Sequence, residues 1–349
     1  MSFTLTHVFS VKETVSDCKA LHDLFEALDL AFVEQVLERS YGRKSVGRHP
    51  RSLLGQFKME LLKRVARIES YEELYRLLLG DEDLCRLCNI KPSEKPYHPS
   101  ILSRFRKRVG PEAFQLVMVH CLKKLNRMQV LYAGTVALDA TFIEAYSRRD
   151  PKNSRRGLSD IEAGLRKQGG NVTLGYGVHL VADTKSEMPL AVVVEPANVN
   201  EKKAAPTLLK KAIKRRRKRR VRHVVADSQY SSQAVREQVK RLGAKPVIPY
   251  PKNQAKDKPV LRVDRRFRSH GPSRLRRLYR KRSAVERVVS RLKTHFGLRQ
   301  LRTRGVRNVL SHVLLCIIAL LANALSAIKQ GLPHRIRSPI HFTKLTWRR

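Results

Sequence analysis

The chain has 349 residues and carries 72 Lys and Arg against 30 Asp and Glu, a formal charge of +42. Such an excess of positive charge repels itself and favours a polyanionic partner, with nucleic acid as the first candidate and an anionic membrane surface as the second. The length and the apolar fraction of 42% argue against a ribosomal protein, and the five scattered cysteines argue against a disulfide framework and favour a reducing cytoplasm.

The N-terminal part of the chain, residues 1–130, is predicted to be helical. Apolar residues recur at helical spacing in residues 18–39, 53–68 and 71–79. A further helix is predicted to begin at Pro99 and Ser100. It carries four basic side chains, Arg104, Arg106, Lys107 and Arg108. We predict that these four bind a DNA backbone, the alternative being a solvated basic face.

From Gly134 onward, short strands alternate with helices. Residues 135–139 and 222–227 are apolar strands that end in an acid, residues 174–182 and 190–195 form a hairpin, and residues 200–214 and 231–242 are helices. The strand over 244–250 contains two prolines, which predicts a position at the edge of a sheet. A long helix begins near Ser273 and ends at Gly297. Periodicity alone therefore predicts an α/β protein with a mixed sheet.

Three basic or polar segments interrupt these elements, residues 147–170, 214–222 and 252–276. Blocks of like charge are usually solvated or face a partner, so we predict that all three lie along DNA. The apolar stretch over 309–328 is punctuated by Ser, His and Asn. It falls short of a clean run of about 20 apolar residues, so a buried C-terminal helix is predicted rather than a membrane span.

Asp139 and Asp227 each follow an apolar strand directly. At the carboxyl ends of neighbouring strands, two such acids would lie close together and repel each other unless cations lay between them. Asp183 is the rival for the second acid, but it is expected in the hairpin turn, away from this pair of strands. Taken singly, Asp139 fits a strand-end cap and Asp227 fits the start of a turn.

A third acid comes from the C-terminal helix. At about 100° per residue, Tyr279, Arg282, Glu286 and Lys293 fall within roughly 60° of arc on one helical face. Glu286 by itself would simply pair with Arg282 at i,i+4. Together with the two aspartates, however, it completes three carboxylates of the kind that hold two metal ions about 3.5–4 Å apart for phosphoryl transfer. Mg²⁺ suits this role because it prefers oxygen ligands and shares substrate phosphates.

The chain resembles the DDE transposases of bacterial insertion sequences, of the insertion-sequence-four type. The spacing of Tyr279, Arg282, Glu286 and Lys293 matches the YREK signature of that family at every position. Residues 138–141 and 226–231 resemble its first-acid and second-acid motifs, and residues 175–179 and 196–200 resemble its strand and helix-entry segments. The resemblance covers about residues 50–310. It departs at Gln229, where the family usually has glycine, and at Glu201, where it often has aspartate.

The resemblance implies an all-α DNA-binding domain over residues 1–130, a ribonuclease H-like catalytic domain over 131–310, and a C-terminal helix with a basic tail over 311–349. It implies that Asp139, Asp227 and Glu286 bind two Mg²⁺ ions, with Mn²⁺ as the alternative. The enzyme would cut DNA at terminal inverted repeats and join the 3′-hydroxyl ends to target DNA. Arg282 and Lys293 would hold phosphates near the cut, and Tyr279 would stack or hydrogen-bond there.

The expected partners are double-stranded DNA and a second copy of the chain, in a homodimer that brings two DNA ends together. The expected location is the bacterial or archaeal cytoplasm at the nucleoid, with no membrane partner. Two alternatives remain. One is a decayed or domesticated transposase that binds DNA without catalysis. The other is a metal-dependent nuclease of the same fold that performs no strand transfer.

Overall fold

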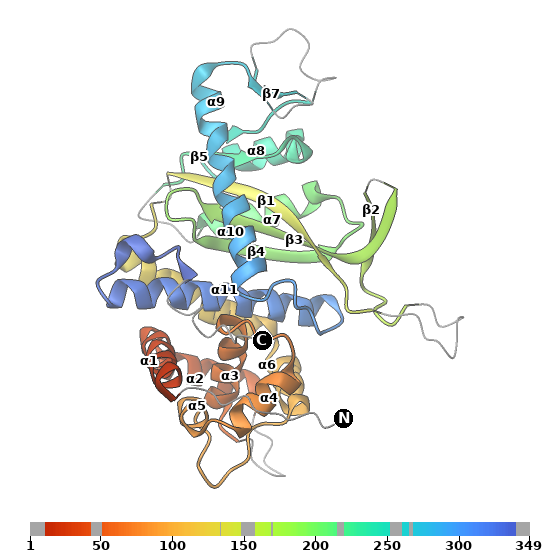
Figure 1. The fold of residues 1–349 in the computed structure, drawn as a ribbon. Helices are drawn as coiled ribbons and strands as arrows, with labels where there is room; N and C mark the ends of the chain where they lie inside the picture. Colours follow the sequence, from red (N-terminus) through yellow and green to blue (C-terminus); the bar gives the residue numbers. More distant parts are fainter. Residues whose placement is uncertain are drawn as a thin grey trace, which may run out of the picture. The chain divides into compact units, whose positions relative to one another are not determined.

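The computed structural model describes residues 11–42, 51–132, 134–147, 158–168, 170–214, 220–251, 260–264 and 268–339. These residues form two compact units (Figure 1). The helical unit belongs to Met1–Val117 and Ile318–Arg349, and the sheet unit to Met118–Ile317. The boundaries differ from the predicted ones at residues 130 and 310 because they fall inside two long helices, α6 (Pro99–Arg127) and α11 (Val306–Lys329).

The helical unit begins with five helices, in the region where periodicity predicts helices. They are α1 (Val11–Ala27), α2 (Leu30–Tyr41), α3 (Leu53–Val65), α4 (Tyr71–Leu79) and α5 (Glu82–Leu87). Helices α2 to α5 each start at a capping side chain that accepts a backbone hydrogen bond from three residues further on, at Asp29, Ser52, Ser70 and Asp81. Helix α6 begins at Pro99, as predicted, and kinks at Gly110, whose φ of 74° lies outside the helical region.

Among the described residues, six strands form one mixed sheet (Figure 1). They are β1 (Thr135–Glu144), β2 (Gly164–Gln168), β3 (Asn171–Asp183), β4 (Pro189–Pro196), β5 (His223–Ala226) and β6 (Lys245–Val247). The order is β2-β3-β1-β5-β6, and β4 also pairs with β3. The predicted hairpin is β3–β4, and β6 lies at the sheet edge as its proline predicts.

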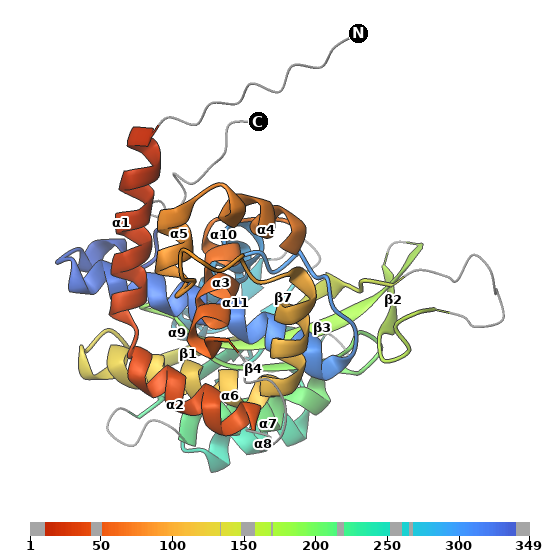
Figure 2. The ribbon, with the colours of Figure 1, turned by 90° about the horizontal axis from the view of Figure 1, so that it is seen from below.

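Strand directions complete the fold. Strands β4, β3 and β1 are antiparallel neighbours, and β5 and β6 run parallel to β1. Helix α10 (Ser283–His295) packs on β1 and β3, while α7 (Glu201–Lys214) packs on the opposite face against β3 and β4 (Figures 1 and 2). A mixed sheet of this order with helices on both faces is a ribonuclease H-like fold, so the predicted fold class is confirmed.

Two parts of the sheet unit differ from the sequence prediction. Strand β2 lies within the segment 147–170, which carries no strand-like alternation of apolar residues. It pairs with the first residues of β3, and the hairpin projects beyond the rest of the sheet (Figure 2). The predicted helix from Ser273 to Gly297 consists of α9 (Ser273–Tyr279), a 3₁₀ turn over Arg280–Arg282, and α10. Gly297 does end it, with a φ of 71°.

The remaining elements are α8 (Gln233–Arg241), the short strands β7 (Arg262–Val263) and β8 (Ser269–His270), and α11. Helix α11 is long and apolar enough to cross a membrane by length and composition, but 94% of its most apolar window is buried inside the protein. This burial agrees with the predicted buried C-terminal helix. The predicted basic tail from residue 340 lies outside the described residues, as do most of the basic residues of 214–222 and 252–276.

Candidate active site

Asp139 and Asp227 lie on neighbouring parallel strands. Leu138 of β1 pairs with Ala226 of β5, so the residue that follows each of them lies at the same level of the sheet. Asp227 directly follows β5, as predicted. Asp139, by contrast, lies within β1 rather than at its end, because β1 continues to pair with β3 as far as Glu144. The sheet therefore brings the two aspartates together although only one of them ends its strand.

Arg282 links the first acid with the third. Its Nη1 lies 3.4 Å from Oδ2 of Asp139, and its Nη2 lies 2.5 Å from Oε1 of Glu286. The Asp139 and Arg282 side chains are 20% and 22% exposed, whereas Glu286 is 48% exposed. One guanidinium group from the 3₁₀ turn thus holds a strand acid and a helix acid on opposite sides of itself. The i,i+4 pairing of Arg282 with Glu286 is therefore present, and the same guanidinium also contacts Asp139.

The surroundings of Asp139 favour a bound cation. Burial raises the pKa of the Asp139 carboxyl to about 6, and the Glu286 and Asp227 carboxylates add to this rise, while Arg282 and the Ala140 N–H oppose it. Clustered carboxylate oxygens are ligands that hard divalent ions prefer. Within the described part of the chain no three acidic, His or Cys side chains stand in ready metal-binding geometry. A cation bound to both Asp139 and Glu286 would take the place of the Arg282 guanidinium.

Asp227 caps a 3₁₀ turn over Ser228–Tyr230, of which Tyr230 is buried. Its Oδ1 accepts hydrogen bonds from the backbone N–H and the hydroxyl of Ser228. Tyr230 at the end of the turn is fully buried, with its hydroxyl 3.3 Å from Nδ1 of His179 and hydrogen-bonded to Glu201. Burial lowers the pKa of His179 to about 4, so the ring is neutral near pH 7. The position of Asp227 is therefore tied to β3 and to the start of α7.

Glu201 is a residue of this region that the sequence prediction leaves out of the site. It begins α7, and burial raises the pKa of its carboxyl, with Asp227 adding to the rise and Arg166 opposing it. The signal that pointed to it was its place directly after the helix-entry segment 196–200. Neither its charge nor its spacing distinguished it from other helix-starting acids.

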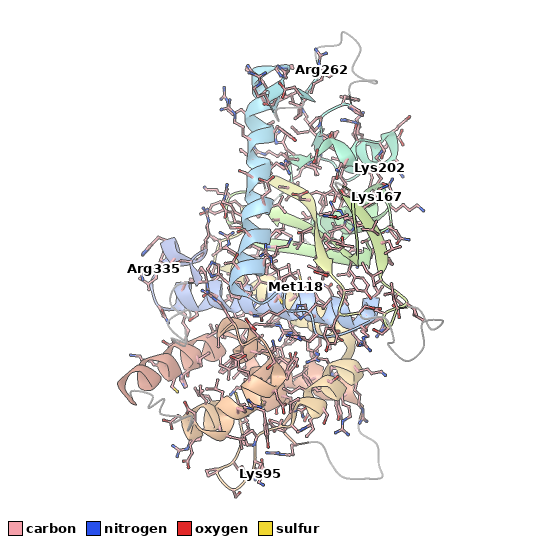
Figure 3. All side chains as sticks on the ribbon, turned by 45° about the vertical axis from the view of Figure 1, so that its right-hand side comes forward. Lys95, Met118, Lys167, Lys202, Arg262 and Arg335 are labelled. Carbon is pink, nitrogen blue, oxygen red and sulfur yellow. The ribbon has the colours of Figure 1, made fainter. Side chains whose placement is uncertain are left out.

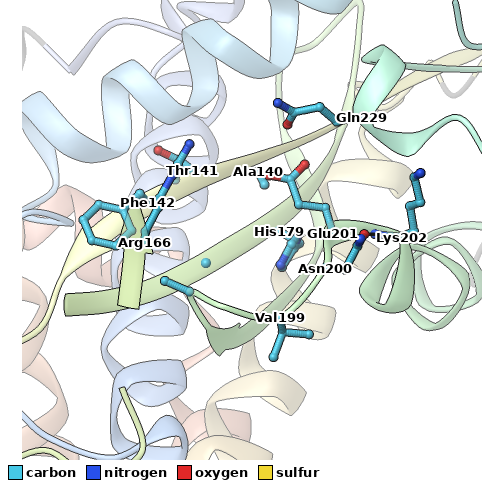
Figure 4. Close-up of a pocket in the computed structure, with 12 residues that line it drawn as sticks. Ala140, Thr141, Phe142, Arg166, His179, Val199, Asn200, Glu201, Lys202 and Gln229 are labelled. Carbon is cyan, nitrogen blue, oxygen red and sulfur yellow. Dashed lines mark hydrogen bonds between the residues drawn. The ribbon is translucent and has the colours of Figure 1, made fainter. Parts of the chain in front are cut away.

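A pocket of about 380 Å³ is lined by residues of β1, β2, β3 and the start of α7 (Figure 4). Ala140 and Gln229, which follow Asp139 and Asp227 closely in the chain, form part of its wall. The polar residues of its lining come from β1, β2, β3, α7 and the loop before α7. They are Thr141, Arg166, His179, Asn200, Glu201 and Lys202. Glu201 therefore lines a concave, mixed-charge space of the sort that binds a polar ligand, whereas Asp139 and Asp227 only adjoin lining residues in the chain.

Comparison with known protein families identifies the chain. A family model described as "Transposase DDE domain" matches residues 133–322, and a second, described as "Transposase domain (DUF772)", matches residues 9–108. The first match covers more than half of the chain and includes Asp139, Asp227 and Glu286. The chain belongs to the DDE transposase family. It is thus a transposase of the polynucleotidyl transferase type, a class that generally uses divalent metal ions.

Solved transposase structures resemble this transposase only loosely. The cryo-EM structure of the piggyBac transposase synaptic complex with hairpin DNA has a TM-score of 0.41 and 10% identity, covering 97% of this chain and 82% of that chain. The Mos1 transposase paired-end complex with the left transposon end has a TM-score of 0.21 and 14% identity, covering 59% and 61%. Similarities of this size assign no residue. No curated protein matches the chain.

The structure separates the four residues of the predicted helical face into two groups. Tyr279 packs against Val225, Val247 and Leu261, and its hydroxyl is hydrogen-bonded to Arg282, so it helps to position that guanidinium. Lys293, two turns beyond Glu286, lies instead near Arg299 and Arg166. Burial lowers the pKa of Lys293, and these two like charges lower it further. The site therefore has a bridging arginine at the acids and a separate cluster of cations beyond them.

The four basic residues of α6 have different surroundings. Arg104 and Lys107 are exposed. Arg108 is exposed too, and it donates hydrogen bonds to the carbonyls of Tyr41 and Gly42 at the end of α2. Arg106 is only 6% exposed and forms an ion pair with the fully buried Glu60. The DNA contact predicted for Arg106 is therefore wrong for this conformation, because a buried acid takes up its charge.

Proposed function

We propose that this transposase is of the insertion-sequence-four type, and that it cuts DNA at the terminal inverted repeats of its element and joins the 3′-hydroxyl ends to target DNA. The observation that carries the proposal is that Asp227, beside Asp139 on the neighbouring strand, and Glu286, on the helix, both lie close enough to Asp139 to raise the pKa of its carboxyl. The match of Tyr279, Arg282, Glu286 and Lys293 to the YREK signature supports the insertion-sequence-four assignment.

The three carboxylates would hold two divalent ions, Mg²⁺ first and Mn²⁺ second. When bound, such a pair supplies Lewis-acid activation of water and stabilises the attacking and leaving oxygens of an in-line displacement. Arg282, released from Glu286 and Asp139 by the incoming charge, is then free to hold the phosphate at the cut. Tyr279 keeps Arg282 oriented, and Lys293 holds a neighbouring phosphate. Ser228 fixes one oxygen of Asp227 and leaves the other for a metal ion.

The proposed partner is double-stranded DNA, both the terminal repeats and the target. The formal charge of +42 supports this because phosphate contacts by Lys and Arg release counterions. Basic side chains such as Lys167 on β2 and Lys202 on α7 are exposed on the sheet unit (Figure 3). Arg104, Lys107 and Arg108 are proposed as DNA contacts of the helical unit. We further propose a homodimer on two DNA ends, in the cytoplasm.

The test is a cleavage and joining assay with labelled terminal-repeat DNA, a target plasmid and Mg²⁺. Glu286→Gln keeps the size of the side chain but removes a carboxylate, and we expect it to abolish both cleavage and joining. The matched control is Glu237→Gln on α8, which removes a carboxylate that is 49% exposed and 3.8 Å from Arg241, outside the site. We expect this control to retain full activity.

Three results would overturn parts of the proposal. Cleavage without joining in the unaltered protein would indicate a nuclease. Binding without metal-dependent cleavage would indicate a transposase that has kept only DNA binding. Undiminished cleavage by Glu286→Gln would remove Glu286 from the catalytic carboxylates.

A further inference from the structure

A second cluster of basic and aromatic side chains lies at the far end of β1, away from the acids. The guanidinium carbons of Arg302 and Arg304 lie 5.7 and 5.5 Å from the ring centre of Tyr146. Arg304 also donates a hydrogen bond of 3.0 Å to the Tyr146 carbonyl. Both arginines are exposed, and the tyrosine is 39% exposed. Two cations held on one ring have fewer orientations to lose when they bind an anion.

Two acids hold this cluster in place without neutralising it. Asp160 accepts a hydrogen bond from the backbone N–H of Gly305, and Glu162 accepts one of 2.9 Å from the N–H of Val306. Both acids thus bind backbone groups at the start of α11, where negative charge is favoured. Asp160 is also bound by the hydroxyl of the buried Tyr176. The segment that carries Arg302 and Arg304 is therefore anchored at its end, next to Gly305.

The positive charges at this end of the sheet unit lack acidic partners in the described part of the chain. Neither Arg302 nor Arg304 forms an ion pair with a described residue, and Lys293 lies near both Arg299 and Arg166, so that like charges are neighbours there. Gathering cations in this way costs electrostatic energy unless an anion binds them. A phosphate backbone, with one charge at every nucleotide, matches a row of cations better than a single small anion does.

The chain gives an upper limit to the distance of this cluster from the cut. Strand β1 runs from Asp139 toward Tyr146, seven residues further on, which spans at most about 23 Å at about 3.3 Å per residue. Helix α10 and the loop after it lead from Glu286 to Arg302 and Arg304, so a strand and a helix that start at the acids meet again at Tyr146. DNA rises about 3.4 Å per base pair, so this upper limit corresponds to at most about seven base pairs.

We propose that Tyr146, Arg302 and Arg304 form a binding surface for the backbone of double-stranded DNA, within about seven base pairs of the phosphate that is cut. The Tyr146 ring orients the two guanidinium groups, which donate to phosphate oxygens. This inference rests on the proposed function, because the acids define the position of the cut. It favours duplex backbone over an unpaired base, since the arginines already cover the aromatic ring that a base would stack on.

The experiment measures DNA binding by the Glu286→Gln protein, which leaves the DNA intact. Terminal-repeat duplexes are shortened stepwise from either side of the cut, from about ten to about four base pairs, a range that starts above the limit of about seven set by the strand length. The test variant adds Arg302→Ala and Arg304→Ala. The control variant adds Lys240→Ala and Arg241→Ala at the end of α8 instead, which removes the same two charges from exposed positions.

We expect the parent protein to lose affinity in one step as one side of the duplex is shortened, at a length of about seven base pairs or fewer, and the test variant to show no such step. We also expect the slope of log affinity against log salt to fall by about 0.9 for each phosphate that is no longer neutralised, about 1.8 for the double variant, and to stay unchanged in the control. Arg302→Ala alone, which leaves the Arg304 hydrogen bond intact, should give about half of this change in slope.

The inference is overturned if the parent protein shows no step on either side, or if the test variant keeps both the step and the slope of the parent protein. The inference is also overturned if the double variant has a lower melting temperature while Arg302→Ala alone binds DNA with the salt slope of the parent protein. That result would mean that the arginines act on stability and not on DNA binding. If the protein with Glu286 intact cleaves terminal-repeat DNA but the step is missing, this inference alone fails. If it neither binds nor cleaves that DNA, the proposed function fails with it.

Discussion

Glu187 is expected to hold helix α10, and with it Glu286, against the sheet. This residue lies in the turn between β3 and β4 with a positive φ of 57° and is 2% exposed. Its Oε1 lies 2.8 Å from Nε and 2.7 Å from Nη2 of Arg287, and its Oε2 lies 2.8 Å from Nη2 of Arg291. Since Arg287 directly follows Glu286, these ion pairs fix the helix at the turn that carries the proposed catalytic acid. The perturbation is Glu187→Gln, which removes the charge and keeps the shape.

The magnitude follows from the burial of the partners. Removing one member of a buried ion pair costs about 3–5 kcal/mol because the remaining charge is left without compensation. Arg291 is 14% exposed, so its charge stays largely buried without a partner in the variant. Arg287 is 53% exposed, so water can solvate its charge instead. We therefore expect a loss of about 3 kcal/mol in the free energy of unfolding, at the lower end of that range. For a unit of this size the melting temperature falls by about 6–12 °C.

The assay combines calorimetric melting with cleavage of terminal-repeat DNA at a temperature where the variant is still folded. We expect cleavage to fall as well, because a loosened α10 no longer holds Glu286 opposite Asp139. Glu237→Gln serves again as the control, since its pair with Arg241 is exposed and worth at most about 1 kcal/mol. A melting temperature within about 1 °C of the unaltered protein would refute the stabilising role, and full cleavage by a clearly destabilised variant would refute the link to Glu286.

Three further outcomes are expected. Tyr230→Phe removes a hydroxyl that contacts Glu201 and His179, and we expect about tenfold weaker Mn²⁺ binding by calorimetric titration. The control Tyr176→Phe removes another buried hydroxyl, which is bound to Asp160, and should leave the Mn²⁺ affinity unchanged. Equal losses of Mn²⁺ affinity in the two variants would contradict the role of Tyr230. The pKa of Asp139 in the metal-free protein, about 6 against an ordinary 3.8, means that its contribution to stability is present below about pH 4 and is lost as the pH rises through 6. A metal ion needs the carboxylate, so Mn²⁺ affinity should fall about tenfold between pH 7 and pH 5, and an unchanged pH dependence in Asp139→Asn would contradict this assignment. Arg106→Ala leaves the buried Glu60 with Arg64 as its remaining cation, and urea unfolding should show a loss of about 3 kcal/mol, whereas the exposed Lys107→Ala should change stability by less than about 0.5 kcal/mol.

Local patterns predicted most of the elements. The helical character of the N-terminal part, the β3–β4 hairpin, the edge position of β6 and the end of the long helix at Gly297 follow from periodicity, proline and glycine. The helix predicted over residues 18–39 is instead divided into α1 and α2, because Asp29 caps the start of α2. Strand β2 and the true end of β1 do not follow from local patterns. Both depend on pairing with β3, a partner distant in sequence, and the segment 164–168 has no apolar alternation of its own.

For the candidate site, the sequence determined the chemistry. Two acids after apolar runs and a glutamate at helical spacing from an arginine and a tyrosine led to the prediction of Asp139, Asp227 and Glu286, which stays a prediction; the structure places Asp227 directly after its strand and Asp139 within one. Tertiary structure alone decided which charges neutralise which. Arg282 forms ion pairs with both Asp139 and Glu286, and Arg106 forms one with the buried Glu60. Glu201 is hydrogen-bonded to Tyr230, in the turn that Asp227 caps. Burial and ion pairing depend on which surfaces meet in space, and one-dimensional spacing carries no information about that.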